Sequence, residues 1–346
     1  MVRDMARDVA RDGGLDVSVV KPEQRMSALL LRLAPQEGYT QSHLEGVRFL
    51  RADQPVARTP VLYEPSIVIV CQGQKRGYVD DRVYRYDAQH YLVLSVPLPF
   101  SSETDASPEH PVLAVSIRLD MTAVVDLVTA LAEAGKYPTE APQGIVSTPL
   151  DEPLQNVTVR LLEALSTPLE AKLLAPAIVR EMCYRVLIGE QGGAIRAALG
   201  QQGQFGRVSR VLRRIHVEYS QPLDVGGLAN DAGLSVAAFH THFKAVTRTS
   251  PIQYIKSIRL HQARLMMIRD RLTAAAAAAR VGYESPSQFN REFKRLFGRS
   301  PGEETRSMKT LFSLLPPTQL QQPVDLNASN YRAVRDVRLT PSMSNG

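Results

Sequence analysis

Hydrophobic and polar positions follow two different periods along this chain. Between residues 47 and 119, short apolar or alternating runs are separated by turn residues, a pattern that predicts β-strands. We expect strands at residues 47–51, 66–72, 75–79, 82–86, 89–95 and 112–119. Strands this short and this closely spaced favour a small barrel or sandwich.

From residue 120 onward, apolar residues recur at helical spacing, and we expect helices at residues 122–133, 154–165, 169–188 and 194–199. Within residues 169–188, one stripe of apolar side chains comprises Leu173, Leu174, Ile178, Met182, Val186 and Leu187. Such a stripe is typical either of packing against the protein's own barrel or of a dimerisation helix. The sequence leaves both interpretations open.

A segment near the C-terminus occurs twice, because residues 224–251 and 273–301 align with a single one-residue shift. Each copy has an Ala in a small-residue helix, a Gly four residues later, the pattern Phe-x-x-x-Phe-Lys, and a closing Ser-Pro. The matching pairs are Ala229 and Ala278, Gly233 and Gly282, Phe239 and Phe289, Phe243 and Phe293, and Lys244 and Lys294. This order predicts a duplicated helix-turn-helix, a motif typical of DNA-binding proteins.

In the second helix of each copy, the two phenylalanines are four residues apart and therefore share one buried face. The opposite face carries Ala237, His240, Thr241 and Lys244 in the first copy, and Ser287, Gln288, Asn290, Arg291 and Lys294 in the second. Arg pairs well with guanine and Asn or Gln with adenine, whereas we assign Lys244 to phosphate. We expect DNA contacts from these residues, with more base discrimination from the second copy.

One helix over residues 252–271 is expected between the copies. At about 1.5 Å per residue it spans roughly 30 Å, close to the ~34 Å of one turn of B-DNA. The two copies could then enter successive major grooves on one face of the duplex. Arg259, Arg264 and Arg269 would be available for phosphates.

Positive charge is concentrated in the duplicated region. Residues 207–309 hold 18 Lys and Arg against 8 Asp and Glu, so their net charge is +10, which leaves −4 for the rest of a chain of net charge +6. This distribution is typical of a polyanion binder, although an ordinary solvated surface can also carry it.

The barrel region shows no constellation for catalysis. His43, His90 and His110 lack the His-x-His pair and the nearby Glu of a cupin metal site, so we expect no catalytic residue, metal or cofactor. Cys71 lies on an apolar strand and is expected to be a small buried hydrophobe; the alternative is a redox- or electrophile-sensing thiol. Neither a signal peptide nor an apolar run long enough for a membrane span is expected.

The barrel could hold a small molecule without reacting on it. Candidate inward-facing residues are Val68, Val70, Tyr84, Tyr86, Tyr91 and Val93. Equally, these side chains could merely fill the barrel.

The duplicated region contains two distinctive stretches. They are Gly282-Tyr-Glu-Ser-Pro-Ser-Gln-Phe-Asn-Arg-Glu-Phe-Lys-Arg-Leu-Phe-Gly298-Arg-Ser-Pro301 and Ser250-Pro-Ile-Gln-Tyr-Ile-Lys-Ser-Ile-Arg-Leu260. Both resemble the DNA-binding domain of AraC/XylS-type bacterial transcription regulators. Tyr63-Glu-Pro-Ser, Gln72-Gly-Gln-Lys-Arg and Leu98-Pro likewise resemble the AraC-type N-terminal domain. The resemblance implies a cupin-like barrel that senses an effector, a helical follow-on and a DNA-binding module.

Three features depart from the family pattern. Residues 274–279 are consecutive alanines where Val or Ile is usual at 274 and 277, which predicts a softer second subdomain. Arg248 stands where Gly usually ends the second helix of the first copy. Glu304 and Thr305 replace the usual Tyr-Arg near the end of the domain. None lies on the helix faces from which we expect DNA contacts, so we expect an effect on the affinity for DNA rather than the loss of DNA binding.

We therefore predict an α+β two-domain protein. Its expected parts are a disordered N-terminus (1–20), a cupin-like effector-binding β-barrel (21–120), a helical segment (121–199), a linker (200–206), an all-α domain with two helix-turn-helix motifs joined by a long helix (207–308) and a mobile tail (309–346). The expected function is sequence-specific regulation of transcription, as activator or repressor, in the bacterial cytoplasm at the nucleoid.

The expected partners are double-stranded operator DNA, a small-molecule effector, RNA polymerase and a second copy of the chain. Two alternatives stay open at this stage. One is a metal-dependent cupin enzyme with an accessory DNA-binding module, and the other is a non-specific architectural DNA binder.

Overall fold

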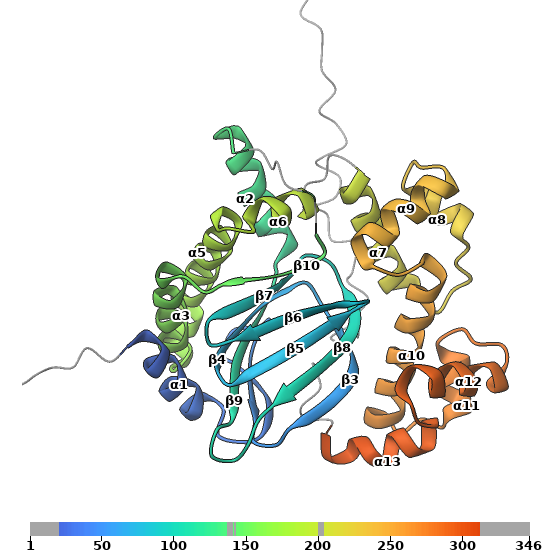
Figure 1. Ribbon diagram of the computed structural model, residues 1–346, viewed down its shortest axis with the longest axis horizontal. Helices are drawn as coiled ribbons and strands as arrows, with labels where there is room; N and C mark the ends of the chain where they lie inside the picture. Colours follow the sequence, from blue (N-terminus) through green and yellow to red (C-terminus); the bar gives the residue numbers. More distant parts are fainter. Residues whose placement is uncertain (1–20, 137–140, 142, 200–203, 312–346) are drawn as a thin grey trace, which may run out of the picture.

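A computed structural model describes residues 21–136, 141, 143–199 and 204–311. The N-terminal half is a ten-stranded antiparallel sheet that curves into a half-barrel (Figure 1). The strands are β1 (Gly38–Gln41), β2 (Val47–Ala52), β3 (Val56–Tyr63), β4 (Ser66–Gln72), β5 (Gln74–Val79), β6 (Arg82–Asp87), β7 (His90–Leu94), β8 (Leu98–Asp105), β9 (Val112–Arg118) and β10 (Ile145–Pro149). Their order is β1-β2-β9-β4-β7-β6-β5-β8-β3, with β10 paired to β7.

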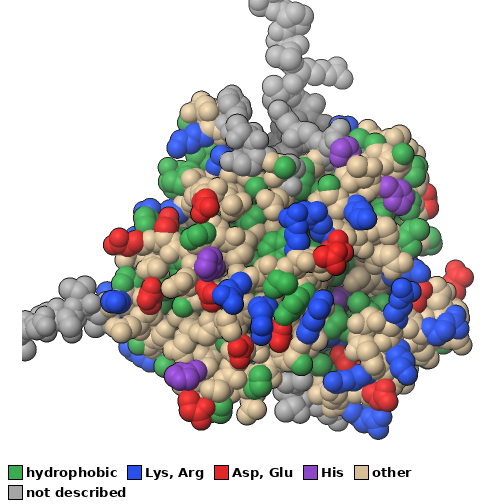
Figure 2. Space-filling model, in the orientation of Figure 1, with side chains coloured by type: hydrophobic (Ala, Val, Ile, Leu, Met, Phe, Trp, Pro, Cys, Tyr) green, Lys and Arg blue, Asp and Glu red, His purple; other side chains and the backbone are tan. Residues whose placement is uncertain are grey.

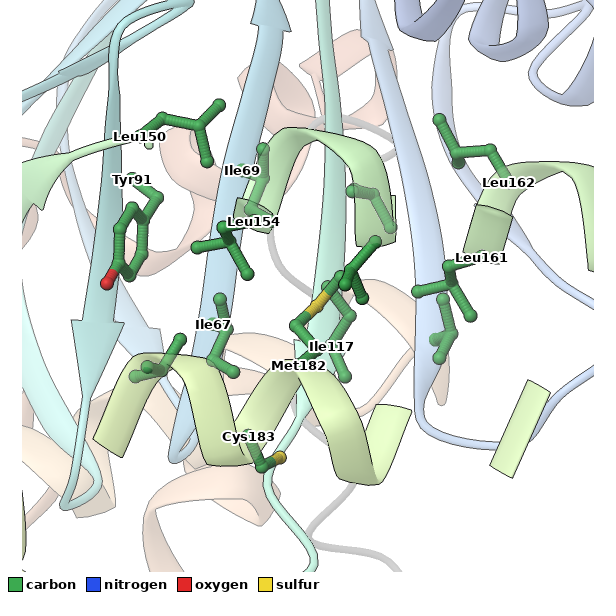
Figure 3. Packing of buried hydrophobic residues seen from close by; sticks show 14 of the residues in the cluster. Ile67, Ile69, Tyr91, Ile117, Leu150, Leu154, Leu161, Leu162, Met182 and Cys183 are labelled. Atoms are coloured by element: carbon green, nitrogen blue, oxygen red, sulfur yellow. The ribbon is translucent and has the colours of Figure 1, made fainter. Parts of the chain in front are cut away.

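Alternation along the central strands gives the sheet two apolar faces. On β4, Ile67 and Ile69 face the helices that follow in the chain, whereas Val68 and Val70 face the inside of the half-barrel. Figure 3 shows the helical side, where Ile67 and Ile69 belong to the same apolar cluster as Leu154 and Met182. The central strand β4 is therefore buried on both faces.

Helices cover the first of these faces (Figure 1). They are α1 (Pro22–Leu33), α2 (Met121–Glu133), α3 (Glu152–Ala164), α4 (Pro168–Leu173), α5 (Ala175–Ile188) and α6 (Gly192–Leu199). The single helix expected over residues 169–188 is in fact two. Pro176 has no backbone N–H with which to continue α4, but it fits the first turn of α5, where none is needed.

The apolar stripe of residues 169–188 is divided by this break. Met182, Val186 and Leu187 of α5 are buried against the sheet, as the packing interpretation predicts. Leu173 and Leu174, next to the break, are exposed.

The C-terminal part is all helical, as expected. Its helices are α7 (Gln204–Glu218), α8 (Val225–Asp231), α9 (Val236–Thr247), α10 (Pro251–Arg269), α11 (Ala274–Arg280), α12 (Pro286–Phe297) and α13 (Pro301–Leu311). Because α7 already begins at Gln204, the last residues of the expected linker are helical. The α+β fold with an N-terminal half-barrel and a helix-turn-helix region is confirmed.

Four strands were not predicted: β1, β3, β8 and β10. β3 contains Pro60 and a register shift, both of which are tolerated because β3 is an edge strand. β8 turns Ser102 and Thr104 as well as apolar residues to its buried face, so its sequence does not alternate between apolar and polar positions.

The expected disordered N-terminus, residues 200–203 of the expected linker and the tail from residue 312 lie outside the described residues. None of the helices in the described part is both long enough and apolar enough to cross a membrane.

The half-barrel and the C-terminal helices bury side chains against each other. Leu62 of β3 and Val96, which precedes β8, belong to the apolar cluster built on α7 to α10. In return, Met308 of α13 belongs to the cluster inside the half-barrel. The two parts are therefore packed together as well as joined by the chain.

A polar contact crosses the same boundary. The hydroxyl of Tyr254 on α10 donates to the backbone oxygen of Pro97 at 2.7 Å and lies 2.8 Å from Nε2 of His216. Because a carbonyl only accepts, the hydroxyl proton points at Pro97, and Nε2 of His216 must donate to the hydroxyl oxygen. Burial lowers the pKa of His216 to about 3, so its ring is neutral at pH 7.

Candidate nucleic-acid interface

Helix α9 holds its two phenylalanines in the core. Phe239 and Phe243 are fully buried, and the Phe243 ring meets that of Tyr254 edge-on, with ring centroids 5.4 Å apart. The predicted contact residues Ala237, His240, Thr241 and Lys244 are all exposed. The Thr241 hydroxyl donates to the backbone oxygen of Ala237 at 3.1 Å, which leaves the hydroxyl oxygen as an acceptor.

Helix α12 repeats this arrangement. Phe289 and Phe293 are buried, and Phe297 extends the aromatic row with its ring centroid 4.5 Å from that of Phe293. The predicted residues Ser287, Gln288, Asn290, Arg291 and Lys294 are all exposed. Their contact with DNA stays a prediction, but the helix turns them to solvent as the spacing of the phenylalanines requires.

Serine side chains fix where both helices begin. Ser235 Oγ accepts a hydrogen bond from the backbone N–H of Ala238, and Ser285 Oγ accepts one from that of Gln288, each at 3.3 Å. These caps satisfy backbone donors of the first turn. They therefore set which residues lie at the N-terminal ends of α9 and α12, the ends that contact bases in helix-turn-helix proteins.

A carboxylate on α12, that of Glu292, was not predicted as part of the site from the sequence. Glu292 accepts hydrogen bonds from Lys256 Nζ on α10 at 2.6 Å, the Tyr283 hydroxyl at 2.7 Å and Gln288 Nε2 at 3.1 Å. Burial raises the pKa of Glu292, but the hydrogen bonds from Lys256, Tyr283 and Gln288 outweigh it and hold the pKa below its usual value. The signal in the sequence was the i, i+4 spacing of Gln288 and Glu292.

Arg259, which we expected at phosphates, is used inside the protein instead. Its guanidinium donates to the backbone oxygens of Tyr219 at 2.7 Å, Gln221 at 2.8 Å and Gly282 at 3.2 Å. These carbonyls lie in the turns after α7 and α11. Arg259 therefore joins the two helix-turn-helix units, a role that helical periodicity alone does not reveal.

Arg264 was also expected at phosphates, but it is buried. Its Nη1 donates to the backbone oxygen of Pro60 at 3.1 Å and lies 3.5 Å from Glu304 Oε1, and the guanidinium covers the ring of Phe297. Both side chains of this ion pair are nearly inaccessible to solvent. The departure at Glu304 thus has a structural role, and Arg269 is the exposed arginine of the three expected at phosphates.

Lys and Arg side chains gather over the lower right of the molecule, where α11 to α13 lie (Figure 2). Exposed residues from α12 and the turn after it are Arg291, Lys294, Arg295 and Arg299. A positive surface on and beside α12 favours the approach of a phosphate backbone.

Two family models match the chain. One is described as the AraC-type transcriptional regulator N-terminus and matches residues 43–194; the other is a helix-turn-helix domain and matches residues 228–307. The chain belongs to the AraC family of transcriptional regulators. The resemblance expected from the sequence is confirmed.

Curated relatives of this AraC-family chain are regulators too. The RCS-specific HTH-type transcriptional activator RclR of Escherichia coli (strain K12) is 37% identical over 87 residues, which are 25% of this chain and 31% of RclR. The probable thc operon regulatory protein of Rhodococcus erythropolis is 26% identical over 217 residues, which are 59% of this chain and 64% of that protein. The matched part is thus less than two thirds of either relative.

Solved structures of ToxT from Vibrio cholerae share the two-domain fold. One has a TM-score of 0.52 at 12% identity and covers 80% of this chain and 99% of ToxT. Another, described as unsaturated fatty acid bound wild-type ToxT, has a TM-score of 0.51 at 15% identity and covers 81% of this chain and 98% of that one. Identities this low show the fold alone.

In the AraC-family half-barrel, the six candidate effector residues fall on both faces of the sheet. Val68, Val70 and Tyr86 lie inside the half-barrel, and Tyr84 packs against them. Tyr91 and Val93 lie on the opposite, helical side (Figure 3 shows Tyr91). The expectation that all six face inward is therefore wrong for these two.

The reason is the alternation of β7, which turns Leu92 and Leu94 inward in their place. A small apolar cavity does lie on the helical side, lined by Ile67, Val93, Leu119, Val124, Cys183, Val186, Leu187 and Ile195. The inner face has polar groups instead: the Tyr86 hydroxyl is 3.1 Å from Ser102 Oγ, and Lys75 is buried.

The thiol of Cys71 is buried on β4, as expected for a small hydrophobe. Burial raises its pKa to about 12, so the thiol stays protonated at neutral pH, which disfavours thiolate chemistry. Within the described ranges, no group of three or more His, Cys, Asp or Glu lies close enough together to hold a metal ion.

Proposed function

We propose that this AraC-family regulator reads operator DNA with α9 and α12, which we call the reading helices. The observation that carries the proposal is that all nine predicted contact residues are exposed above two buried phenylalanine pairs. The 19 residues of α10 join the two units. At about 1.5 Å per residue they span roughly 28 Å, which suits successive major grooves.

The reading helices differ in chemistry. On α12, Arg291 suits guanine, and Asn290 and Gln288 suit adenine. On α9, His240 and Thr241 offer hydrogen bonds, whereas Ala237 offers only apolar contact to a thymine methyl group, and Lys244 suits phosphate. Ser287 and Lys294 complete the contact surface of α12. We therefore assign most of the base discrimination to α12.

The test compares Arg291→Ala with Lys244→Ala in the full-length protein. An operator is first selected from random duplexes, and affinity is then measured for that operator and its single-base variants at several salt concentrations. Arg291→Ala should relax discrimination at one base pair by about 1–3 kcal/mol. Lys244→Ala should weaken binding to all DNA sequences alike. It should also reduce the magnitude of the slope of log affinity against log salt concentration by about 1.

Unchanged discrimination in Arg291→Ala would mean that the face assigned to α12 is wrong. The alternative of an architectural DNA binder is separated by competition between operator and random duplex at fixed salt. A sequence-specific regulator prefers its operator by about 10³-fold or more, whereas binding through phosphates alone shows little preference.

We infer further that a small-molecule effector at the inner face of the half-barrel changes operator affinity. The burial of Leu62 and Val96 among the DNA-binding helices, and of Met308 inside the half-barrel, supports such coupling. So does the fatty acid bound to ToxT, which shares the fold. Compounds that raise the melting temperature of the full chain would be added to operator-binding assays. A ligand of the inner face that leaves operator affinity unchanged contradicts the coupling.

We also propose a homodimer, because the α4–α5 region exposes Leu169, Leu173 and Leu174, each more than half accessible to solvent. Large exposed apolar patches mark interaction surfaces. Sedimentation of the wild type and of Leu169→Ser/Leu173→Ser tests this proposal, since a dimer should shift toward monomer in the double variant. Equal sedimentation of the two proteins contradicts it.

Promoter binding would place the regulator at the nucleoid in the cytoplasm, with RNA polymerase as a partner. We assign no catalytic step to the half-barrel. Metal analysis of the purified protein separates this proposal from a cupin enzyme, because stoichiometric bound metal would favour the enzyme.

A further inference from the structure

The side-chain amide of Gln288 is held in one orientation. Gln288 lies in the first turn of α12 and is exposed, yet its Nε2 is 3.1 Å from Oε1 of Glu292. A carboxylate only accepts hydrogen bonds, so the amide must turn its NH₂ group towards Glu292. Its carbonyl oxygen therefore points away from Glu292 with both lone pairs unused by that contact.

Glu292 is itself fixed from two further sides. Lys256 Nζ of α10 donates to Oε1 at 2.6 Å, and the Tyr283 hydroxyl, in the turn before α12, donates to Oε2 at 2.7 Å. The Tyr283 ring packs edge-on against Phe289, with centroids 5.3 Å apart. Rotating the carboxylate away would break both hydrogen bonds, so Gln288 faces a stationary acceptor.

We propose that Glu292 is a positioning residue that makes Gln288 an acceptor in the major groove. This inference rests on the proposed reading function of α12. A glutamine amide that can turn over offers oxygen or NH₂ to a base edge. Held by Glu292, Gln288 presents its oxygen to the exocyclic amino group of adenine or cytosine, whereas guanine and thymine present acceptor oxygens at the same place.

The first copy of the repeat lacks a counterpart of the Gln288–Glu292 pair. Aligning Phe239 with Phe289 places Ala238 at the position of Gln288 and His242 at that of Glu292. Neither half of the amide–carboxylate pair is present there. The proposed constraint therefore belongs to the operator half read by α12, and the half read by α9 serves as an internal control.

The experiment measures base preference with the full-length protein. A selected operator is varied to all four bases at each position contacted by α12, and affinities are compared for the wild type, Gln288→Ala, Glu292→Leu and the double variant. The wild type should prefer adenine or cytosine at one position by about tenfold. Gln288→Ala should abolish that preference, and Glu292→Leu should reduce it to less than about threefold, because leucine offers no acceptor to the NH₂ group and the Gln288 amide can then turn over.

In the Gln288→Ala background, Glu292→Leu should change base preference no further, since both act on one contact. Lys256→Met is the matched control: it breaks the same ion pair with Glu292 but leaves the Gln288 contact in place. It should lower the melting temperature and keep the base preference. A folding check by thermal unfolding accompanies every variant.

Three results would overturn the inference while leaving the reading face in place. They are a preference for guanine or thymine at the position that Gln288→Ala relaxes, a full preference retained in Glu292→Leu, and equal relaxation by Lys256→Met and Glu292→Leu. If Gln288→Ala changes no base preference, the inference falls. Arg291→Ala, measured on the same operators, then decides whether the reading face of α12 falls with it.

Discussion

At the scale of single residues, each of the two reading helices is followed by a residue in the left-handed backbone conformation. The residue is an arginine after α9 and a glycine after α12. Arg248 follows α9 with φ of 60°, and Gly298 follows α12 with φ of 76°. The left-handed region costs a residue with a Cβ atom about 1–2 kcal/mol, a cost that glycine avoids. The departure from the family pattern at Arg248 therefore carries backbone strain.

We expect Arg248→Gly to raise the free energy of unfolding by about 1 kcal/mol, because it relieves this strain. Gly298→Ala should lower it by about the same amount. An added Cβ at Gly298 would meet no atom within 4 Å, so only the backbone conformation is at issue there. Urea unfolding of the full chain measures both changes. A less stable Arg248→Gly or a more stable Gly298→Ala would contradict the argument.

At the scale of elements, the hydrophobic periodicity of the sequence predicted which face of each reading helix is buried and which is exposed. The spacing of Phe239 and Phe243, and of Phe289 and Phe293, was enough to place the exposed faces of both reading helices. It could not show the partners of Arg259 and Arg264, or the partners of Glu292 outside α12, because these depend on which segment packs across the helix.

For the strands, too, the sequence alone could not show which residues face the inside of the half-barrel. Ser102 and Thr104 face inward on β8 because other strands cover them, and Tyr91 faces outward because of the register between β7 and β4. Both facts are set by pairing with distant segments. Candidate pocket residues inferred from single strands were therefore less reliable than contact residues inferred from a duplicated helix.

The second helix-turn-helix unit is expected to be the softer one. Ala277 and Ala278 are the buried residues of α11, so short side chains fill its share of the core. Phe293 is fully buried between Phe289 and Phe297. Phe293→Ala should cost roughly 3–5 kcal/mol and open α11 to α13 first, because Phe293 lies at the centre of the aromatic row in that core.

Hydrogen exchange measures this effect segment by segment. Phe243→Ala in the first unit is the matched control and should loosen α8 and α9 instead. Faster exchange in α8 and α9 than in α11 and α12 of the wild type would contradict the expected order of stability.

At the scale of the whole molecule, the half-barrel and the C-terminal helices contact each other through buried polar groups. Tyr254 donates to Pro97 of the half-barrel and accepts from His216 of α7, and Arg264 reaches the backbone oxygen of Pro60. Such contacts are specific because each loses its partner when the domains shift. They are therefore candidates to carry a change in the half-barrel to the reading helices.

Tyr254→Phe tests this arrangement with the loss of one oxygen atom. The change keeps the buried ring but leaves the Pro97 carbonyl and Nε2 of His216 without their partner, so the free energy of unfolding should fall by about 1–3 kcal/mol. Tyr219→Phe is the control, because the Tyr219 ring is half-buried and no hydrogen bond of its hydroxyl occurs in the described part of the chain. Urea unfolding followed by tyrosine fluorescence and by circular dichroism should also separate into two transitions in Tyr254→Phe. If Tyr219→Phe is equally destabilising, or if Tyr254→Phe unfolds like the wild type, the contact does not couple the two domains.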